Sequence, residues 1–147
     1  MSRRAIVLYA ATFAALCALS AQEPRVNTRY IPATQVSATF AKGGTLVDRN
    51  DGNYSIMAAH REKPGEVEVH ELDTDIVYVV QGKAELVTGG SVVDAKTTAK
   101  NEVRAGSITG GESRQLSQGD VVIIPAGIPH WFREVPAAFD YLVVKVR

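Results

Sequence analysis

The stretch GDVVIIPAGIPH, residues 119–130, decides the fold of this chain. It joins four consecutive branched apolar residues, a Pro-Ala-Gly turn, and a histidine, His130, that begins the next run. Apolar, β-branched runs bounded by proline and glycine are typical of strands joined by tight turns. The turn therefore sets the position of His130 relative to the strand before it.

A second stretch, PGEVEVHELDTD at residues 64–75, carries carboxylates and a histidine on a predicted strand. Glu68 and His70 are two residues apart, so their side chains point to the same face, because strand side chains alternate.

Other short runs rich in Val, Ile and Tyr follow the same pattern, and Gly, Pro, Asn-Asp-Gly or Lys-Pro-Gly separates most of them. No helical pattern recurs between these runs, so a parallel βαβ fold is disfavoured and a β-sandwich or closed barrel is expected. The predicted strands are 45–49, 54–61, 66–70, 76–80, 84–88, 121–125 and 139–146.

The first stretch resembles the second signature motif of the cupin superfamily, G-x5-P-x-G-x2-H-x3-N. Gly119, Pro125, Gly127 and His130 fill this motif at the right spacing, and Glu134 replaces its final asparagine. The resemblance implies an all-β fold, a small double-stranded β-helix or jelly-roll barrel, over residues 44–147.

The second stretch resembles the first cupin motif, G-x5-H-x-H-x4-E-x6-G, in a degenerate form. Counting back from Gly82 places Asp75 at the glutamate position, His70 at the second histidine and Glu68 at the first. The two motifs together extend the resemblance over roughly residues 55–146.

The cupin resemblance implies one divalent metal ion, bound by Glu68, His70, Asp75 and His130. Two imidazoles and two carboxylates suit Zn, Fe, Mn or Ni. Asp75 is one methylene shorter than glutamate, which limits its reach. A carboxylate that the metal does not use, Glu68 or Asp75, is the natural general base. The alternatives to these metal-binding roles are that Glu68 and Asp75 are solvated carboxylates and that His70 is a hydrogen-bonded histidine of the core.

Two further residues are candidates for the same site. If the chain forms a hairpin centred on Pro64, His60 lies opposite Glu68 and becomes a fifth ligand or an acid/base group; otherwise it is a surface or packing histidine. Phe132 shares the strand face of His130 and is expected to line the cavity.

The first twenty residues have the pattern of a secretory signal peptide: two arginines, an uncharged apolar run at 5–18, and small residues before a cleavage point near Ser20 or Ala21. A buried helix or an uncleaved anchor is the alternative, and a lipoprotein reading would use Cys17. Cleavage leaves a cysteine-free, exported chain, periplasmic or secreted, with two more acidic than basic residues.

Residues 21–43 are expected to form an arm and one short helix at 33–42, which Gly43-Gly44 ends. Residues 88–118 are predicted to form a hairpin-like excursion between two Gly-Gly turns. Its middle, residues 94–101, is polar and poor in strand-forming residues.

The whole chain has 147 residues, is 46% hydrophobic and 22% charged, and has a formal net charge of zero. This composition argues against disorder and gives no electrostatic case for nucleic acid binding. Three functions stay open: a metal-dependent oxidoreductase, isomerase or lyase acting on a small oxygen-bearing molecule, a binding module for a metal or small ligand, and a metal-free structural barrel. We also expect a homodimer, with no membrane association after signal cleavage.

Overall fold

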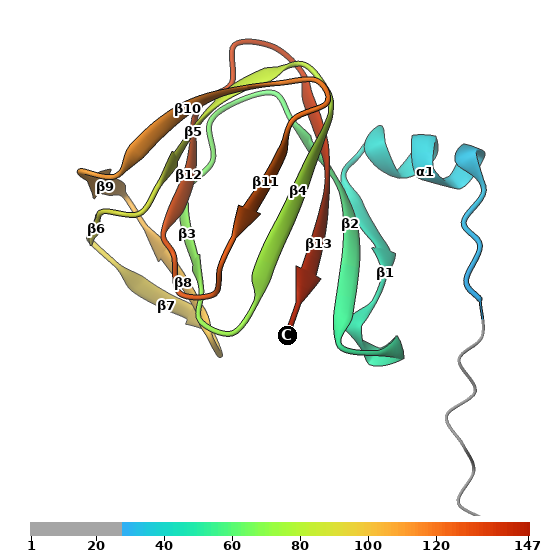
Figure 1. The fold of residues 1–147 in the computed structure, drawn as a ribbon, viewed down its shortest axis with the longest axis horizontal. Helices are drawn as coiled ribbons and strands as arrows, with labels where there is room; N and C mark the ends of the chain where they lie inside the picture. The colour runs from blue at the N-terminus through green and yellow to red at the C-terminus, as the bar shows by residue number, and fades with distance from the viewer. Residues whose placement is uncertain (1–27) are drawn as a thin grey trace, which may run out of the picture.

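The computed structural model describes residues 28–147. Thirteen strands and one short helix make up most of this part of the chain, and two antiparallel sheets face each other as a jelly-roll barrel (Figure 1). The all-β prediction is therefore confirmed, including the short helix that precedes the barrel.

The first sheet has five strands in the order β1-β2-β13-β4-β11, and the second has six in the order β10-β5-β12-β3-β8-β7. A small ribbon, β6 with β9, projects from the barrel (Figure 1). The strands are β1 (Gly44–Val47), β2 (Tyr54–Arg61), β3 (Val67–His70), β4 (Thr74–Gln81), β5 (Lys83–Thr88), β6 (Ser91–Val93), β7 (Lys96–Ala99), β8 (Glu102–Ala105), β9 (Ser107–Thr109), β10 (Glu112–Ser117), β11 (Val121–Ile124), β12 (His130–Glu134) and β13 (Phe139–Val146), with a 3-10 turn η1 (Arg49–Asp51).

Alternate residues of neighbouring strands point into the barrel, and at one end of it these inward residues are apolar. Phe139, Tyr141 and Val143 of β13 are buried, and so are Val77 and Val79 of β4. The Phe132, Phe139 and Tyr141 rings lie with their centroids 4.9–5.5 Å apart. Burial of such large side chains is the main stabilising term of a disulfide-free domain of this size.

Helix α1 (Ala33–Phe40) lies beside β1 and β2, outside the barrel (Figure 1). Val36 and Phe40, four residues apart and so on one helix face, pack on a second apolar cluster that contains Leu46, Val47 and Ala58. The helix covers a sheet face that would otherwise be exposed.

Two glycines of the motifs have backbone conformations that other residues rarely adopt. Gly82 has a φ of 85°, and a Cβ there would overlap the carbonyl oxygen of Ala138. Gly127 has a φ of 78° and donates its N–H to the carbonyl of His70 at 2.8 Å. The turn after β11 is thus tied directly to the strand that carries the first motif.

The predicted excursion at 88–118 is more ordered than its composition indicated. Residues 96–99, in its polar middle, form β7, and β8 returns to pair with β3. The polar composition of this segment does not indicate strands, because their pairing with distant partners, and not local composition, stabilises them.

The signal-peptide prediction lies outside the described residues. Within residues 28–147, no helix is both long enough and apolar enough to cross a membrane.

Candidate metal centre

Strand pairing brings the two motifs together at one end of the barrel. β12 lies between β5 and β3, and His130 pairs with Glu68 across the β12–β3 ladder. His70 lies two residues further along β3 and points to the same side as Glu68. Residues from distant parts of the sequence therefore share one face.

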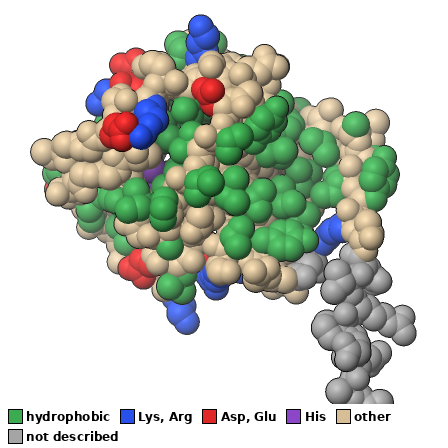
Figure 2. Space-filling view, viewed as in Figure 1, with side chains coloured by type: hydrophobic (Ala, Val, Ile, Leu, Met, Phe, Trp, Pro, Cys, Tyr) green, Lys and Arg blue, Asp and Glu red, His purple; other side chains and the backbone are tan. Residues whose placement is uncertain are grey.

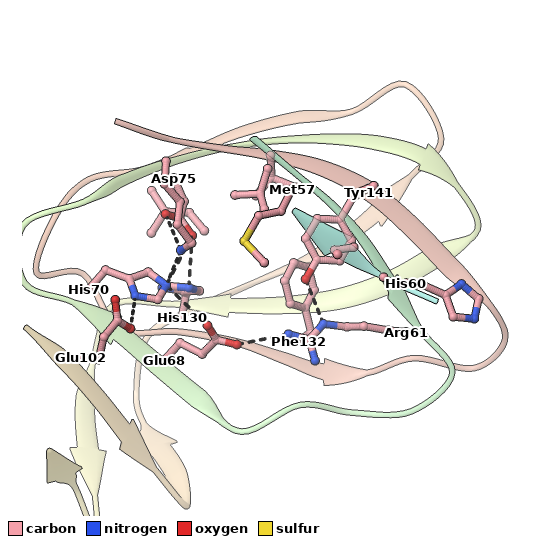
Figure 3. Close-up of a pocket in the computed structure, with 18 of the residues that line it drawn as sticks. Met57, His60, Arg61, Glu68, His70, Asp75, Glu102, His130, Phe132 and Tyr141 are labelled. Atoms are coloured by element: carbon pink, nitrogen blue, oxygen red, sulfur yellow. Dashed lines mark hydrogen bonds and ion pairs between the residues drawn. The ribbon is translucent and has the colours of Figure 1, made fainter. Parts of the chain in front are cut away.

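Glu68, His70 and His130 form a group whose possible ligand atoms all lie within 4.8 Å of one another. Nε2 of His70 is 3.4 Å from a Glu68 carboxylate oxygen, and the two imidazole centroids are 5.1 Å apart. The two histidines are buried. Figure 3 shows these three side chains converging at one end of the cavity.

Asp75 lies beside this group and has a second partner. One of its oxygens is 3.5 Å from Nε2 of His70 and 3.9 Å from Nε2 of His130. Both of its oxygens also accept hydrogen bonds from Nζ of Lys145, at 2.8 and 2.9 Å. The carboxylate is thus near the histidines but is held by an ammonium group.

Each histidine is oriented through its other ring nitrogen. Nδ1 of His70 donates to a carboxylate oxygen of Glu102 at 2.6 Å, and Nδ1 of His130 donates to the carbonyl of Ile128 at 3.1 Å. Carboxylate and carbonyl oxygens only accept, so these contacts direct both Nε2 atoms toward the cavity. Metal-binding histidines are commonly held in this way.

The environment sets the charge of the ligand candidates. Burial raises the pKa of Glu68, but the neighbouring His70 imidazole and the charges of Arg104, His130 and Arg61 outweigh burial and hold that pKa at about 2. Burial lowers the pKa of His130 below its usual value. At neutral pH the site therefore offers an ionised carboxylate and a neutral imidazole.

His70 lies where negative charge is concentrated. Burial lowers its pKa, but the nearby carboxylates of Glu68, Asp75 and Glu102 raise it more, against the opposing charge of Lys145. The net shift is upward, so this point of the cavity favours a positive charge.

The ligand group opens into a cavity of about 520 Å³. Arg61 crosses it: its guanidinium carbon lies 5.1 Å from the Phe132 ring centroid, and its Nε donates to the Tyr141 hydroxyl at 3.0 Å. The same side chain donates to Glu68 at 3.2 Å (Figure 3). One wall is thus aromatic and carries a fixed cation.

The structure separates His60 from the ligand group. The hairpin that would have placed it opposite Glu68 does not form, because β2 pairs with β1 and β13 while β3 pairs with β8 and β12. His60 lines the far end of the cavity, and its Nδ1 contacts Asp140 of β13 at 2.6 Å. On β2 it is Arg61 that reaches Glu68. Phe132, as expected, lines the cavity.

Sequence reasoning missed four charged residues of the cavity: Arg61, Glu102, Arg104 and Lys145. Glu102 and Arg104 lie on β8, inside the segment 88–118 that was predicted only as a hairpin-like excursion. Lys145 left a visible sign in the sequence, since it is the one charged residue in the inward series Phe139, Tyr141, Val143, Lys145.

The residues fit a divalent metal ion by the chemistry of their donors. Two imidazoles and one carboxylate, with both imidazoles oriented by second partners, form a set used for iron(II) and zinc with coordination positions left open. Glu68, His70 and His130 would hold the ion, and Asp75 is the nearest additional carboxylate.

Comparison with solved structures shows the same fold. A cupin-like protein from Thermotoga maritima has a TM-score of 0.51 and 20% identity over 71% of this chain and 66% of its own. The DMSP lyase DddQ from Ruegeria pomeroyi has a TM-score of 0.50 and 19% identity, over 71% of this chain and 46% of its own. Procruciferin, an 11S globulin from Brassica napus, has a TM-score of 0.51 and 17% identity, over 71% of this chain and 24% of its own. The similar region is about two thirds of the first protein and less than half of the other two, and at 17–20% identity the likeness shows the fold alone.

No curated protein sequence matches this chain significantly. The Cupin family model, by contrast, matches residues 50–146, which include both motifs and every strand from β2 to β13. Together with the barrel and the converging Glu-His-His group, this match shows that the chain belongs to the cupin family.

Proposed function

We propose that this protein is a metal-dependent cupin that binds one divalent ion through Glu68, His70 and His130 and acts on a small, anionic, oxygen-bearing molecule. The observation that supports it most is the convergence of these three ligand atoms at the end of a cavity large enough for such a molecule. The reaction would be of the dioxygenase, isomerase or lyase type.

The charges in the cavity favour an anionic substrate. Three cationic side chains, Arg61, Arg104 and Lys145, line the cavity with three carboxylates, Glu68, Asp75 and Glu102. These charges balance, so a bound divalent ion gives the site a net positive charge. A small carboxylate or enolate complements that charge.

The side chains of this chain can divide the work of a reaction. When bound, the divalent ion would polarise a substrate oxygen or activate a water molecule. Arg61, held by the aromatic wall and Tyr141, is placed to orient a substrate carboxylate. Asp75 is the buried carboxylate left beside the two histidines, and it would accept a proton once a substrate draws Lys145 away.

Metal analysis of protein purified without an affinity tag tests the metal part of this proposal. We expect close to one equivalent of a divalent ion in the wild-type protein and a loss of that ion in His130→Ala. His60→Ala is the matched control and should keep it, because His60 lies outside the ligand group. Wild-type protein without metal, or His130→Ala protein that retains it, would contradict the proposal.

A thermal-shift screen tests the substrate class. Lactate, malate and malonate are each compared with the corresponding amide in metal-loaded protein. Stabilisation by the acids and not by the amides is expected, because a ligand that binds only the folded state raises its stability.

A metal-free ligand-binding barrel is the second candidate function. The contact that favours it is Lys145 Nζ to Nε2 of His70 at 2.7 Å, which supplies a cation from the chain itself. Metal analysis separates the two candidates, since only the first requires a bound ion.

The proposal includes export, which the apolar run at residues 5–18 and the small residues near Ser20 support. Intact mass of the protein recovered from a bacterial periplasmic fraction tests it, with a chain lacking residues 1–20 as the expected product. A full-length mass would contradict cleavage.

A homodimer through the β4–β11 face is also proposed. β11 is an edge strand, Val121 and Ile123 on it are 60% and 64% exposed, and Tyr78 of β4 is 46% exposed beside them. Hydrophobic side chains gather over this face in Figure 2. Light scattering should give a dimer for wild type and a monomer for Ile123→Lys. Lys83→Met, which changes an exposed residue of β5 in the other sheet, is the control and should stay dimeric.

A further inference from the structure

Lys145 lies on the inner face of β13 directly across from Asp75 of β4. The two residues are partners in the β13–β4 register, and their side chains are 16% and 6% exposed. The inward positions before Lys145 on β13 are filled by Phe139, Tyr141 and Val143. A lysine in this series buries most of its stem and delivers its ammonium group to the end of the cavity where the ligand group lies.

The ammonium group of Lys145 is hydrogen-bonded to Nε2 of His70, an atom that a metal ion would need as a ligand. Nζ is 2.7 Å from Nε2 of His70 and 2.8 and 2.9 Å from the two oxygens of Asp75. Nε2 of a neutral imidazole has a single lone pair, which serves either a hydrogen bond or a metal bond. Lys145 and a metal ion therefore cannot both use His70.

The position of Lys145 also explains why Asp75 lies outside the group of metal ligands. Asp75 is close to both histidines, yet its two oxygens are engaged by one ammonium group. Hydrogen bonds between charged groups are shorter and stronger than neutral ones, so a carboxylate held twice is a poor competitor for a place on a metal.

We infer that Lys145 is an internal competitor of the metal ion: it holds Nε2 of His70 and the Asp75 carboxylate in the metal-free protein, and it must leave Nε2 when metal binds. This inference rests on the proposed function, since it concerns the same site. Its consequence is a metal site of reduced affinity with three protein ligands, in which Asp75 stays bound to Lys145 and outside the coordination sphere.

Metal affinity, measured without any substrate, tests this inference. Titration calorimetry with Mn²⁺ and with Zn²⁺ is carried out on apo wild type, Lys145→Met, Lys145→Gln and Lys145→Arg. Removal of the ammonium group in the first two variants should tighten binding by about tenfold or more, the scale of one hydrogen bond to a charged group. Lys145→Arg keeps a cation and should stay near wild type.

Two controls make the result specific. Lys83→Met removes an exposed lysine from β5 and should leave affinity unchanged. Asp75→Asn should weaken binding clearly in the Lys145→Met background, where the carboxylate becomes free to ligate, and should weaken it little in wild type. Circular dichroism and thermal melts establish that each variant is folded. If Lys145→Met does not fold, Lys145→Gln replaces it in the comparison.

The outcomes separate the inference from the proposed function. Wild type that binds one equivalent, with Lys145→Met and Lys145→Gln at equal or weaker affinity, overturns the inference and leaves the metal proposal intact. Metal bound only by the Lys145 variants supports the inference and overturns metal dependence of the natural protein. No binding by any of them overturns both.

Discussion

His130 on β12 lies directly opposite Glu68 on β3, and this pairing joins the two halves of the candidate site. The pairing is possible because β12 inserts between β5 and β3, and the Gly127 N–H bonded to the His70 carbonyl fixes the turn beside it. The ligand atoms therefore come from two hydrogen-bonded neighbouring strands and not from loops, which favours a rigid site.

Glu102 is expected to support metal binding without touching the ion. Its carboxylate accepts a 2.6 Å hydrogen bond from Nδ1 of His70 and thereby aims Nε2 at the cavity. Replacement by alanine should lower metal affinity by about 10–100-fold, the usual cost of losing such a partner. Calorimetric titration measures the change, and Glu112→Ala, an exposed glutamate on β10, is the control. Equal affinity in Glu102→Ala and wild type would show that the contact does not orient His70.

Gly82 is expected to be irreplaceable for steric reasons. Its φ of 85° alone makes a side chain unfavourable, and a Cβ would also overlap the Ala138 carbonyl. Gly82→Ala should lower the free energy of unfolding by about 1–3 kcal/mol or more. Gly119→Ala is the matched control, because Gly119 has a φ of 92° but open space around it. Urea unfolding should show a clearly larger loss for Gly82→Ala; equal losses would mean that the overlap is relieved without cost.

Much of the barrel could be predicted from the sequence, and particular residues show why. The apolar run at 121–124, the Pro-Ala-Gly turn and His130 are local patterns, and the strands they predicted are present. The bounds of β2 and β13 were also predicted correctly, because turn-forming residues flank them: Asn-Asp-Gly and Lys-Pro-Gly around β2, and Pro136 before β13.

What could not be predicted depends on which strands pair. The proposed place of His60 assumed that β2 pairs with β3, its neighbour in sequence, whereas β3 pairs with β8 and β12. Glu102 entered the site only because β8 lies beside β3. A one-residue change of register or a different partner moves a side chain to another face, and local sequence does not specify that choice.

His60 is expected to titrate above the usual range. Its hydrogen bond to Asp140, at 2.6 Å, raises its pKa from the ordinary 6.5, against a smaller opposing effect of burial. A raised pKa in the folded state means that the pair stabilises the fold fully below the unfolded pKa and that this contribution is lost as the pH rises through the folded pKa.

Asp140→Asn tests this behaviour. NMR titration of the His60 ring should give a lower pKa in the variant than in wild type. The melting temperature of Asp140→Asn should fall furthest below that of wild type near about pH 5, and the difference should shrink toward about pH 9. Glu62→Gln, which changes the more distant exposed partner at 3.6 Å, should have a smaller effect. An unchanged His60 pKa in Asp140→Asn would contradict the assignment.

Arg61 is expected to determine the affinity for small carboxylates. Its guanidinium is held by the Tyr141 hydroxyl and the Phe132 ring, so it meets a ligand with little loss of side-chain freedom. Arg61→Met keeps much of the apolar stem over the ring and removes the charge; it should weaken the binding of the carboxylates that stabilise wild type by about tenfold or more. Arg114→Met removes an exposed arginine from β10, away from the cavity, and should leave that affinity unchanged. Calorimetry on metal-loaded protein gives the comparison. Undiminished binding by Arg61→Met would mean that the anion is held by the metal or by Arg104 and not by the cation over the aromatic wall.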